Sequence, residues 1–262
     1  MNYLDKIIEH KKNEVKQKRV EVKRLELESS PYFKLPAYSL RQSLLEKNFG
    51  IIAEIKRKSP SKGVIDPDLN PVDLARNYEH SGAAAISVLT DQYFFGGSND
   101  DLLAVRSVSQ LPILRKDFII DEYQIFEAKS IGADCILLIA EVLSKEHLHE
   151  LALIARSLGM EVLMEIHAEA SLEKLNAEVT LIGVNNRNLA TQEIALETSR
   201  RIYPFLPQGV PLISESGIRG ISDLQEIAQI GYQGALIGTS IVAHNKPSAF
   251  LSELVNVQNL AV

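Results

Sequence analysis

Cysteine is almost absent from this sequence of 262 residues, in which Cys135 is the only one. A single cysteine allows no disulfide bond within the chain and no metal site built from several thiolates. Cys135 also lies in the apolar run Cys135–Ile139, where a buried, inert thiol is expected rather than a nucleophile. The sequence therefore excludes a disulfide-stabilised fold and a cysteine-based metal centre within one chain.

Long hydrophobic runs are also missing. The longest apolar stretches have about the length of a strand, well short of the ~20 residues that a membrane-spanning helix needs. The N-terminus is charged from Asp5 onward and lacks the apolar region of a secretory signal. We therefore expect a cytoplasmic protein without a membrane partner.

The sequence has no excess of positive charge, because 34 acidic residues outnumber 28 lysines and arginines and the formal net charge is -6. Such a chain has no global field that would hold DNA, RNA or an anionic membrane. We expect no nucleic-acid partner, and an anionic substrate would have to be held by local groups.

From residue 51 onward, short aliphatic or β-branched runs alternate with longer amphipathic segments. This alternation is typical of parallel strands covered by helices. The eight predicted strands are Ile51–Lys56, Ala84–Leu89, Pro112–Arg115, Cys135–Ile139, Glu161–Glu165, Leu181–Asn185, Pro211–Ser214 and Gly234–Ile237. The predicted helices between them include Pro71–His80, Asp121–Ile131, Lys145–Leu158, Glu193–Ile202 and Ile221–Ile230. Eight such units in about 200 residues predict a closed (β/α)8 barrel, the TIM-barrel architecture, rather than an open sheet.

The first 50 residues do not follow this repeat. Residues 3–28 are predicted to form one charged helix, and the mixed charges from Lys11 to Arg24 indicate a solvated face. A second short helix is expected around Ser39–Lys47, after the break at Ser29-Ser30-Pro31. Because no linker-like tract interrupts the chain, we expect residues 1–262 to form a single domain. In it, residues 1–50 would be a helical extension packed on the barrel or across its mouth.

Nearly every predicted strand ends in polar residues. In a (β/α)8 barrel the catalytic groups lie at these carboxyl ends of the strands. Glu54 and Lys56 are two residues apart, and side chains in a strand alternate between its two sides, so both point to the same side of the first strand. Other strand ends carry Lys116, Glu165, Asn185, Arg187 and Glu215. Acidic and basic groups that converge on one mouth tune each other's pKa values, which favours general acid and base catalysis.

Two small turns form a separate signal. Ser216-Gly217-Ile218 follows the seventh predicted strand and Gly238-Thr239-Ser240 follows the eighth. This fold commonly binds phosphate at those two strand ends through backbone N–H groups, and glycine permits a close approach. The turns predict a binding site for a phosphorylated small molecule.

These residues also resemble a known family. The segment from Ile52 to Gly63, IAEIKRKSPSKG, is similar to the signature of indole-3-glycerol-phosphate synthases. The resemblance extends from residue 1 to about residue 255 and includes further blocks in the family's order. They are Ser87-Val88-Leu89-Thr90, Phe94, Lys116-Asp117-Phe118, Glu165, Asn185-Asn186-Arg187, Ser214-Glu215-Ser216-Gly217-Ile218 and Leu236-Ile237-Gly238-Thr239-Ser240.

The resemblance implies an activity: conversion of 1-(2-carboxyphenylamino)-1-deoxyribulose 5-phosphate to indole-3-glycerol phosphate, without a redox or metal cofactor. It implies Lys116 as the principal general acid, Glu165 as the general base, and Lys56 as a second proton donor or carboxylate partner. The residues that would orient the substrate and set how many protons the site holds are Glu54, Asn185, Arg187 and Glu215. Ser59 would help to hold the anthranilate carboxylate. The implied apolar wall is Phe94, Phe118 and Leu137, and the implied phosphate-site residues are Ser216, Gly217, Leu236, Gly238 and Thr239.

Two positions depart from the family pattern. Asn188 stands where the family commonly has an aspartate, which removes an ion-pair partner of Arg187, and Thr239 stands where a serine is often seen. Both residues keep hydrogen-bonding capacity, so we expect them to be tolerated.

Two other functions are compatible with such a barrel. A phosphoribosylanthranilate isomerase would share the phosphate turns but would use a cysteine and an aspartate as its acid–base pair, and Cys135 lies inside a predicted strand. A catalytically silent scaffold would be expected to lose its charged strand ends first, yet Lys56, Lys116 and Glu165 are present. The sequence leaves open how the acid roles are divided between Lys56 and Lys116, whether the chain works as a monomer, and whether it associates with other pathway enzymes.

Overall fold

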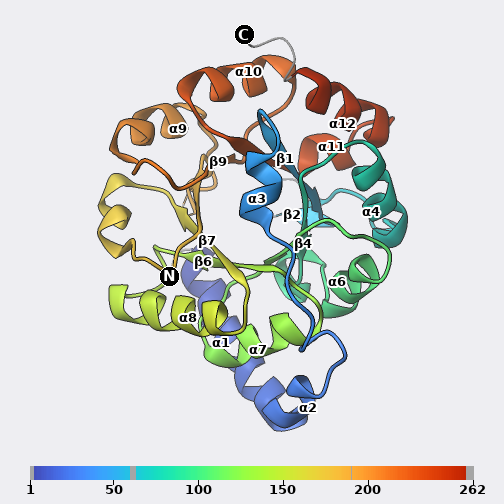
Figure 1. Cartoon of the computed structure of the whole chain (residues 1–262), viewed down its shortest axis with the longest axis vertical. Helices are drawn as coiled ribbons and strands as arrows, with labels where there is room; N and C mark the ends of the chain where they lie inside the picture. The colour runs from blue at the N-terminus through green and yellow to red at the C-terminus, as the bar shows by residue number, and fades with distance from the viewer. Residues whose placement is uncertain (1–2, 60–62, 190, 258–262) are drawn as a thin grey trace.

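The centre of the molecule is a closed barrel of eight parallel strands (Figure 1). The structure is a computed structural model and describes residues 3–59, 63–189 and 191–257. The barrel strands are β1 (Gly50–Ile55), β4 (Ala85–Leu89), β5 (Ile113–Lys116), β6 (Cys135–Ile139), β7 (Glu161–Ile166), β8 (Leu181–Asn185), β9 (Leu212–Glu215) and β10 (Gly234–Ile237). They follow one another around the barrel in chain order, and β10 closes it against β1. The (β/α)8 prediction is confirmed, and each predicted strand lies within one or two residues of an observed one.

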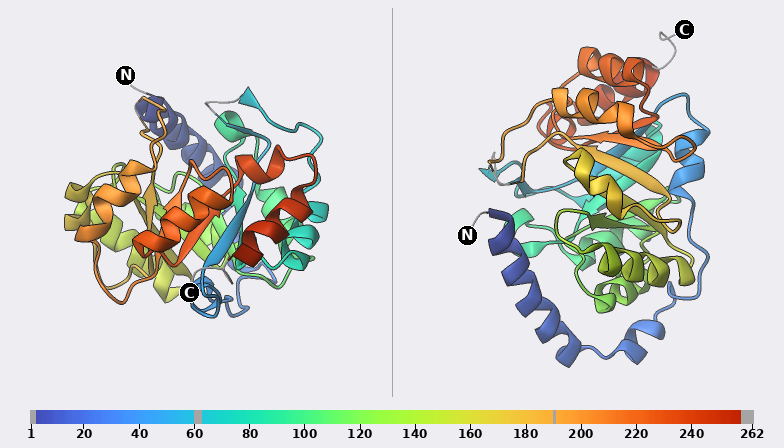
Figure 2. Two further views of the ribbon diagram at one scale, coloured as in Figure 1. Left: turned by 90° about the horizontal axis from the view of Figure 1, so that it is seen from above. Right: turned by 90° about the vertical axis from the view of Figure 1, so that its left-hand side faces the viewer.

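Helices surround the barrel on its outer side, except for the short α5 (Gln92–Phe95) and α11 (Thr239–Val242) at its mouth (Figures 1 and 2). The outer helices are α4 (Pro71–His80), α6 (Asn99–Arg106), α7 (Glu122–Ser130), α8 (Lys145–Ser157), α9 (Glu197–Ile202), α10 (Ile221–Ile230) and α12 (Pro247–Asn256), with 3-10 turns η1 (Glu169–Lys174) and η2 (Tyr203–Phe205). Because helices cover the outside and side chains fill the inside, the strands are buried on both faces and consist of almost unbroken apolar residues.

One predicted helix, Glu193–Ile202, is too long at its N-terminal end. The chain instead returns to the end of β8, where the amide of Ala195 donates to the carbonyl of Asn186 and Ile194 pairs with Arg187. The side chain of Asn186 then accepts from the amide of Ser199 at 3.0 Å. These contacts hold residues 191–196 as a loop, so α9 begins only at Glu197.

The predicted helix over residues 3–28 is divided into α1 (Tyr3–Glu21) and α2 (Arg24–Glu28). The break lies where Tyr123 of α7 meets the chain, because its hydroxyl is 3.1 Å from the carbonyl oxygen of Lys18 and 3.2 Å from that of Val22. The single hydroxyl hydrogen of Tyr123 is donated to one of these two carbonyls at the helix end, where intrahelical donors become scarce. Among the described residues, no helix is both long enough and apolar enough to cross a membrane.

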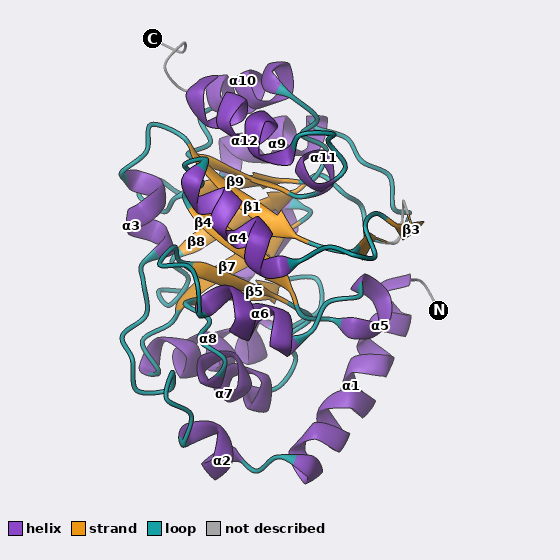
Figure 3. Ribbon diagram, turned by 90° about the vertical axis from the view of Figure 1, so that its right-hand side faces the viewer, coloured by secondary structure: helices purple, strands orange, loops and turns teal. Residues whose placement is uncertain are grey.

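The N-terminal helices cover opposite ends of the barrel (Figure 3). Helix α3 (Leu40–Leu45) begins with Ser39 as its cap and buries Leu40 and Leu44 at the amino ends of the strands. Helix α1 lies at the other end, beside α5 and a small hairpin of β2 (Lys58–Ser59) and β3 (Gly63–Val64). The helical extension therefore closes the floor of the barrel with one helix and reaches its mouth with another.

Candidate active site

A cavity of about 230 Å³ lies at the carboxyl ends of the barrel strands. All eight strands contribute to its lining, since Glu54, Leu89, Lys116, Leu137, Glu165, Asn185, Glu215 and Leu236 each come from a different strand. Tyr3, Leu4 and Ile7 of α1 complete the wall. The cavity brings together every site residue predicted from the sequence except Phe94.

Strand register explains why these side chains meet. Asn185 of β8 is paired with Glu215 of β9, and Glu215 is paired with Leu236 of β10. Residues paired across parallel strands lie at the same height and point to the same face of the sheet. The register therefore places the polar side chains at the ends of different strands in one ring around the mouth of the barrel.

Lys116 lies between two buried carboxylates. Its Nζ is 2.8 Å from Oε2 of Glu165 and 3.4 Å from Oε2 of Glu215. Burial alone would lower the pKa of Lys116, but the negative charges of Glu165, Glu215 and Glu54 outweigh it and raise that pKa above its usual value. Lys116 is thus a cation at neutral pH, with a proton to give when its surroundings change.

The two carboxylates have pKa values shifted in opposite directions. Burial would raise the pKa of Glu165, yet Lys116 and His167 stabilise its anion and hold the pKa below its ordinary value. For Glu215, burial and the negative charges of Glu165 and Glu54 prevail over Lys116 and raise its pKa. The two carboxyl groups therefore differ in charge near neutral pH, with Glu165 ionised, and such a difference is what acid and base catalysis requires.

Glu54 and Lys56 lie on the same side of β1, as their spacing predicts, and form an ion pair at its end. Arg187 follows β8, and its backbone amide donates to Oδ1 of Asn185 at 3.0 Å, which fixes the backbone at this position. Within the described ranges its Nη1 is buried and has no hydrogen-bond partner. This guanidinium therefore presents an unused donor beside the cavity.

The two glycine-containing turns are held together. Ser240 donates its hydroxyl to the carbonyl of Ile218 at 2.6 Å, which links the turn after β10 to the turn after β9. Ser216 adopts φ 65°, a left-handed backbone conformation that residues other than glycine rarely take. The side-chain amide of Asn186 donates to the carbonyl of Ser216 at 3.0 Å. A Cβ added to Gly238 would overlap the carboxylate of Glu54. The turns are therefore fixed in shape, and the turn after β10 is packed directly against Glu54.

The aromatic wall consists of Phe95 and Phe118, whose ring centroids are 6.0 Å apart, with Leu137 and Ile139 beside them. Phe94, which the sequence assigns to this wall, does not line the cavity. Its ring contacts Tyr3 edge-on at 5.8 Å and also His10. Phe94 thus supports α1, and its neighbour Phe95 takes the place at the cavity.

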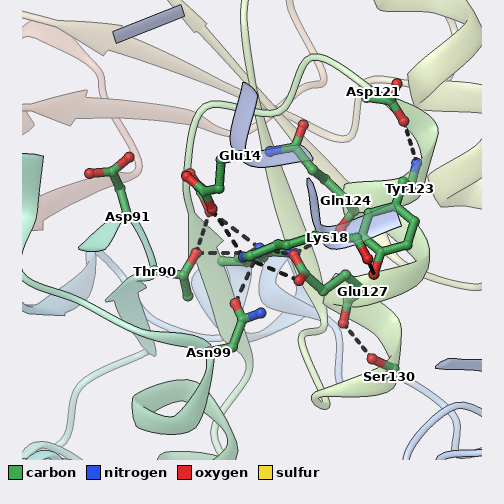
Figure 4. Close-up of polar contacts among 12 residues, drawn as sticks. Glu14, Lys18, Thr90, Asp91, Asn99, Asp121, Tyr123, Gln124, Glu127 and Ser130 are labelled. Carbon is green, nitrogen blue, oxygen red and sulfur yellow. Dashed lines mark hydrogen bonds and ion pairs between the residues drawn. The ribbon is translucent and has the colours of Figure 1, made fainter. Parts of the chain in front are cut away.

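The charges of α1 were predicted to be solvated, and for Lys11 this is wrong. Its side chain is fully buried, with Nζ 2.9 Å from Asp91 and 3.0 Å from Asp117. Lys18 lies between Glu14 and Glu127 of α7, at 3.0 and 3.3 Å (Figure 4). Behind them Arg115 contacts Asp117 and Glu127 from inside the protein. These ion pairs fasten α1 to the strand ends next to Lys116.

Sequence analysis missed two further groups near the site, His167 and Glu141. The spacing of His167, two residues after Glu165, could have indicated that its side chain points to the same side of the strand, whereas Glu141 has no such signal. In residues 3–59, 63–189 and 191–257, no three His, Cys, Asp or Glu side chains are grouped to hold a metal ion.

Comparison with known proteins assigns the chain to a family. The family model described as "Indole-3-glycerol phosphate synthase" matches residues 4–254. A protein of Carboxydothermus hydrogenoformans with that name is 44% identical over 263 residues, covering 97% of this chain and 99% of the relative. A Desulfotalea psychrophila protein with the same name is 45% identical over 253 residues, covering 96% of this chain and 97% of the relative.

Two solved structures share the fold. Tryptophan synthase subunit alpha from Legionella pneumophila has a TM-score of 0.63 at 16% identity, with 86% of this chain and 100% of that chain covered. Thiamine phosphate pyrophosphorylase from Pyrococcus furiosus has a TM-score of 0.61 at 14% identity, with the same coverage. At such low identity these structures show the barrel alone. The match over residues 4–254 and the identity to full-length relatives show that the chain belongs to the indole-3-glycerol phosphate synthase family.

Proposed function

We propose that this chain converts 1-(2-carboxyphenylamino)-1-deoxyribulose 5-phosphate to indole-3-glycerol phosphate by ring closure, decarboxylation and dehydration. The observation that carries the proposal is the position of Lys116 between Glu165 and Glu215, in a cavity that also contains the turns at Gly217 and Gly238. One cavity thus offers an acid, a base and an anion-binding rim to one phosphorylated substrate.

The proton balance of the reaction matches these groups. Ring closure places a proton on the ketose oxygen, the departure of water needs a second proton, and one proton leaves the methylene carbon beside the nitrogen. The carboxylate leaves as carbon dioxide, so each turnover takes up one proton from water. Lys116 supplies protons to the oxygen, and the ionised Glu165 removes the proton from carbon.

The remaining groups that line the cavity would each contact a different part of the substrate. Lys56 and Ser59 meet the anthranilate carboxylate, and the buried Nη1 of Arg187 is a further donor for a substrate oxygen. Phe118 and Leu137 cover the aromatic ring. Backbone N–H groups at Gly217, Gly238 and Thr239 would hold the phosphate, for which the locked turn geometry is suited.

The cysteine-dependent isomerase function lacks comparable support. Cys135 is completely buried inside β6, and burial raises the pKa of its thiol. A thiol in that state is a poor acid or base for a substrate in the cavity.

The direct test is incubation of the purified protein with the substrate while indole fluorescence is followed. We expect fluorescence to rise together with carbon dioxide release, and Glu165→Gln to abolish most of the signal without loss of fold. A folded protein that releases no carbon dioxide would refute the proposal, and isomerisation of phosphoribosylanthranilate would establish the alternative.

A further inference from the structure

His167 stands immediately behind the general base. It follows the last residue of β7 and lies two residues after Glu165, so both side chains point to the same side of the strand. Its Nδ1 is 2.9 Å from Oε2 of Glu141, and its backbone amide donates to Oε1 of Glu141 at 2.9 Å. Ser171 donates its hydroxyl to the same Oε1 at 2.7 Å. Glu141 therefore fixes the ring and places its proton on Nδ1.

The second ring nitrogen faces Glu165. Nε2 is 3.5 Å from Oε1 of Glu165 and, among the described residues, is buried without a hydrogen bond. Glu165 already accepts from Lys116 on Oε2 and from Asn185 on Oε1. A protonated His167 is thus a second cation beside the base, on the side away from Lys116.

His167 does not line the cavity, so it acts on the reaction only through Glu165. This distinguishes it from Lys116, which gives up its proton during the reaction. Once Lys116 is neutral, Glu165 has lost the cation that holds it ionised. A cation that takes no part in the proton transfers to substrate would keep the base in its anionic form at that moment.

We propose that His167, oriented by Glu141, is a positioning residue that keeps Glu165 ionised independently of the protonation state of Lys116. The proposal rests on the proposed function, because it assigns a partner to that function's general base. The charged and titratable groups around His167 are Glu141 from the loop after β6, Glu165 from β7 and Lys116 from β5. Burial lowers the pKa of His167, but the two glutamates outweigh burial and Lys116 and raise that pKa.

The pH dependence separates this role from a structural one. Loss of an opposite charge close to a carboxylate commonly shifts its pKa by about one unit or more, so without His167 the ionised fraction of Glu165 would fall about tenfold at low pH. Above the pKa of His167 the wild-type enzyme has lost the same cation. A variant without the imidazole should therefore be impaired at low pH and should approach the wild type as pH rises.

The experiment is a pH profile of kcat for wild type and His167→Asn, because kcat reports the enzyme–substrate complex in which the proton transfers take place. Asparagine keeps a donor near the position of Nδ1 for Glu141 but ends before Glu165. We expect the acid limb of the profile to move to higher pH, with a loss of about tenfold at the lowest pH and convergence at high pH. His147→Asn on α8 is the matched control, and its profile should be that of the wild type.

A second variant tests the link to Glu141. Glu141→Gln removes the charge that stabilises protonated His167, so its acid limb should move in the same direction. Combined with His167→Asn it should add no further defect, because both changes act through one group. A His167→Asn enzyme with a wild-type profile, or with a loss equal at every pH, would overturn the proposal. Because wild type is measured in the same series, inactive wild type would count against the proposed function instead.

Discussion

Lys11 of the N-terminal helix and Asp117, the neighbour of Lys116, form an ion pair of 3.0 Å in the protein interior. Asp117 is buried, yet its pKa lies well below its usual range because Lys11 and Arg115 stabilise the anion. The same Lys11 contacts Asp91, which caps α5 by accepting from the amide of Phe94. One side chain thus connects α1 to the loop that follows Lys116 and to the helix that carries Phe95.

Lys11→Met should therefore destabilise the protein and weaken substrate binding. Removing one partner of a buried ion pair typically costs about 3–5 kcal/mol, because the remaining charges stay buried without compensation. We expect a lower Tm and a higher KM, since Tyr3, Leu4 and Ile7 of the same helix line the cavity. Lys16→Met, at an exposed position of α1, is the control and should change neither quantity. A normal Tm in Lys11→Met would mean that α1 is held by its apolar contacts alone.

Lys116→Met should reduce kcat by at least about 10²-fold, the lower range of general acid catalysis, with a modest change in KM. The methionine keeps most of the volume but removes the proton and the charge between Glu165 and Glu215. Steady-state kinetics and circular dichroism of the variant test this. If kcat stayed within a few-fold of wild type in a folded protein, the acid would have to be sought elsewhere, with Lys56 as the first candidate.

Glu215→Gln should flatten the dependence of stability on pH. The pKa of Glu215 is raised in the folded state by burial and by the neighbouring carboxylates. A carboxyl whose pKa is raised on folding contributes stability that is present at low pH, below the unfolded value of about 4.3, and is lost as pH rises through the folded pKa. Since glutamine does not titrate, the stability of the variant should fall less than that of wild type over this rise in pH. Denaturant unfolding at a series of pH values measures the difference, and parallel curves would show that Glu215 is not protonated in the folded enzyme.

Gly238→Ala should impair kcat as well as KM. The added methyl would overlap the carboxylate of Glu54 and so disturb its ion pair with Lys56, in addition to narrowing the phosphate turn. Gly220→Ala is a suitable control, because a Cβ there meets no atom within 4 Å. Kinetics in which only KM changed would place the effect at the phosphate alone.

The barrel and most of its active site are determined by signals that lie close together in the sequence. Apolar runs such as Cys135–Ile139 identify strands because both faces of a parallel strand are buried, and polar residues after each run identify the mouth. Lys116, Glu165 and Glu215 could therefore be assigned to one site before their distances were known.

The tertiary structure alone decided which charges are buried and which pair with each other. Lys11 and Asp117 are far apart in the chain, and the mixed charges around Lys11 have the composition of a solvated helix. His167 likewise has an ordinary local sequence, and its role depends on Glu141 from the preceding strand's loop. The energy of an ionic group depends on its burial and on charges brought near it by folding, which are properties of the packed structure and not of neighbouring residues in the sequence.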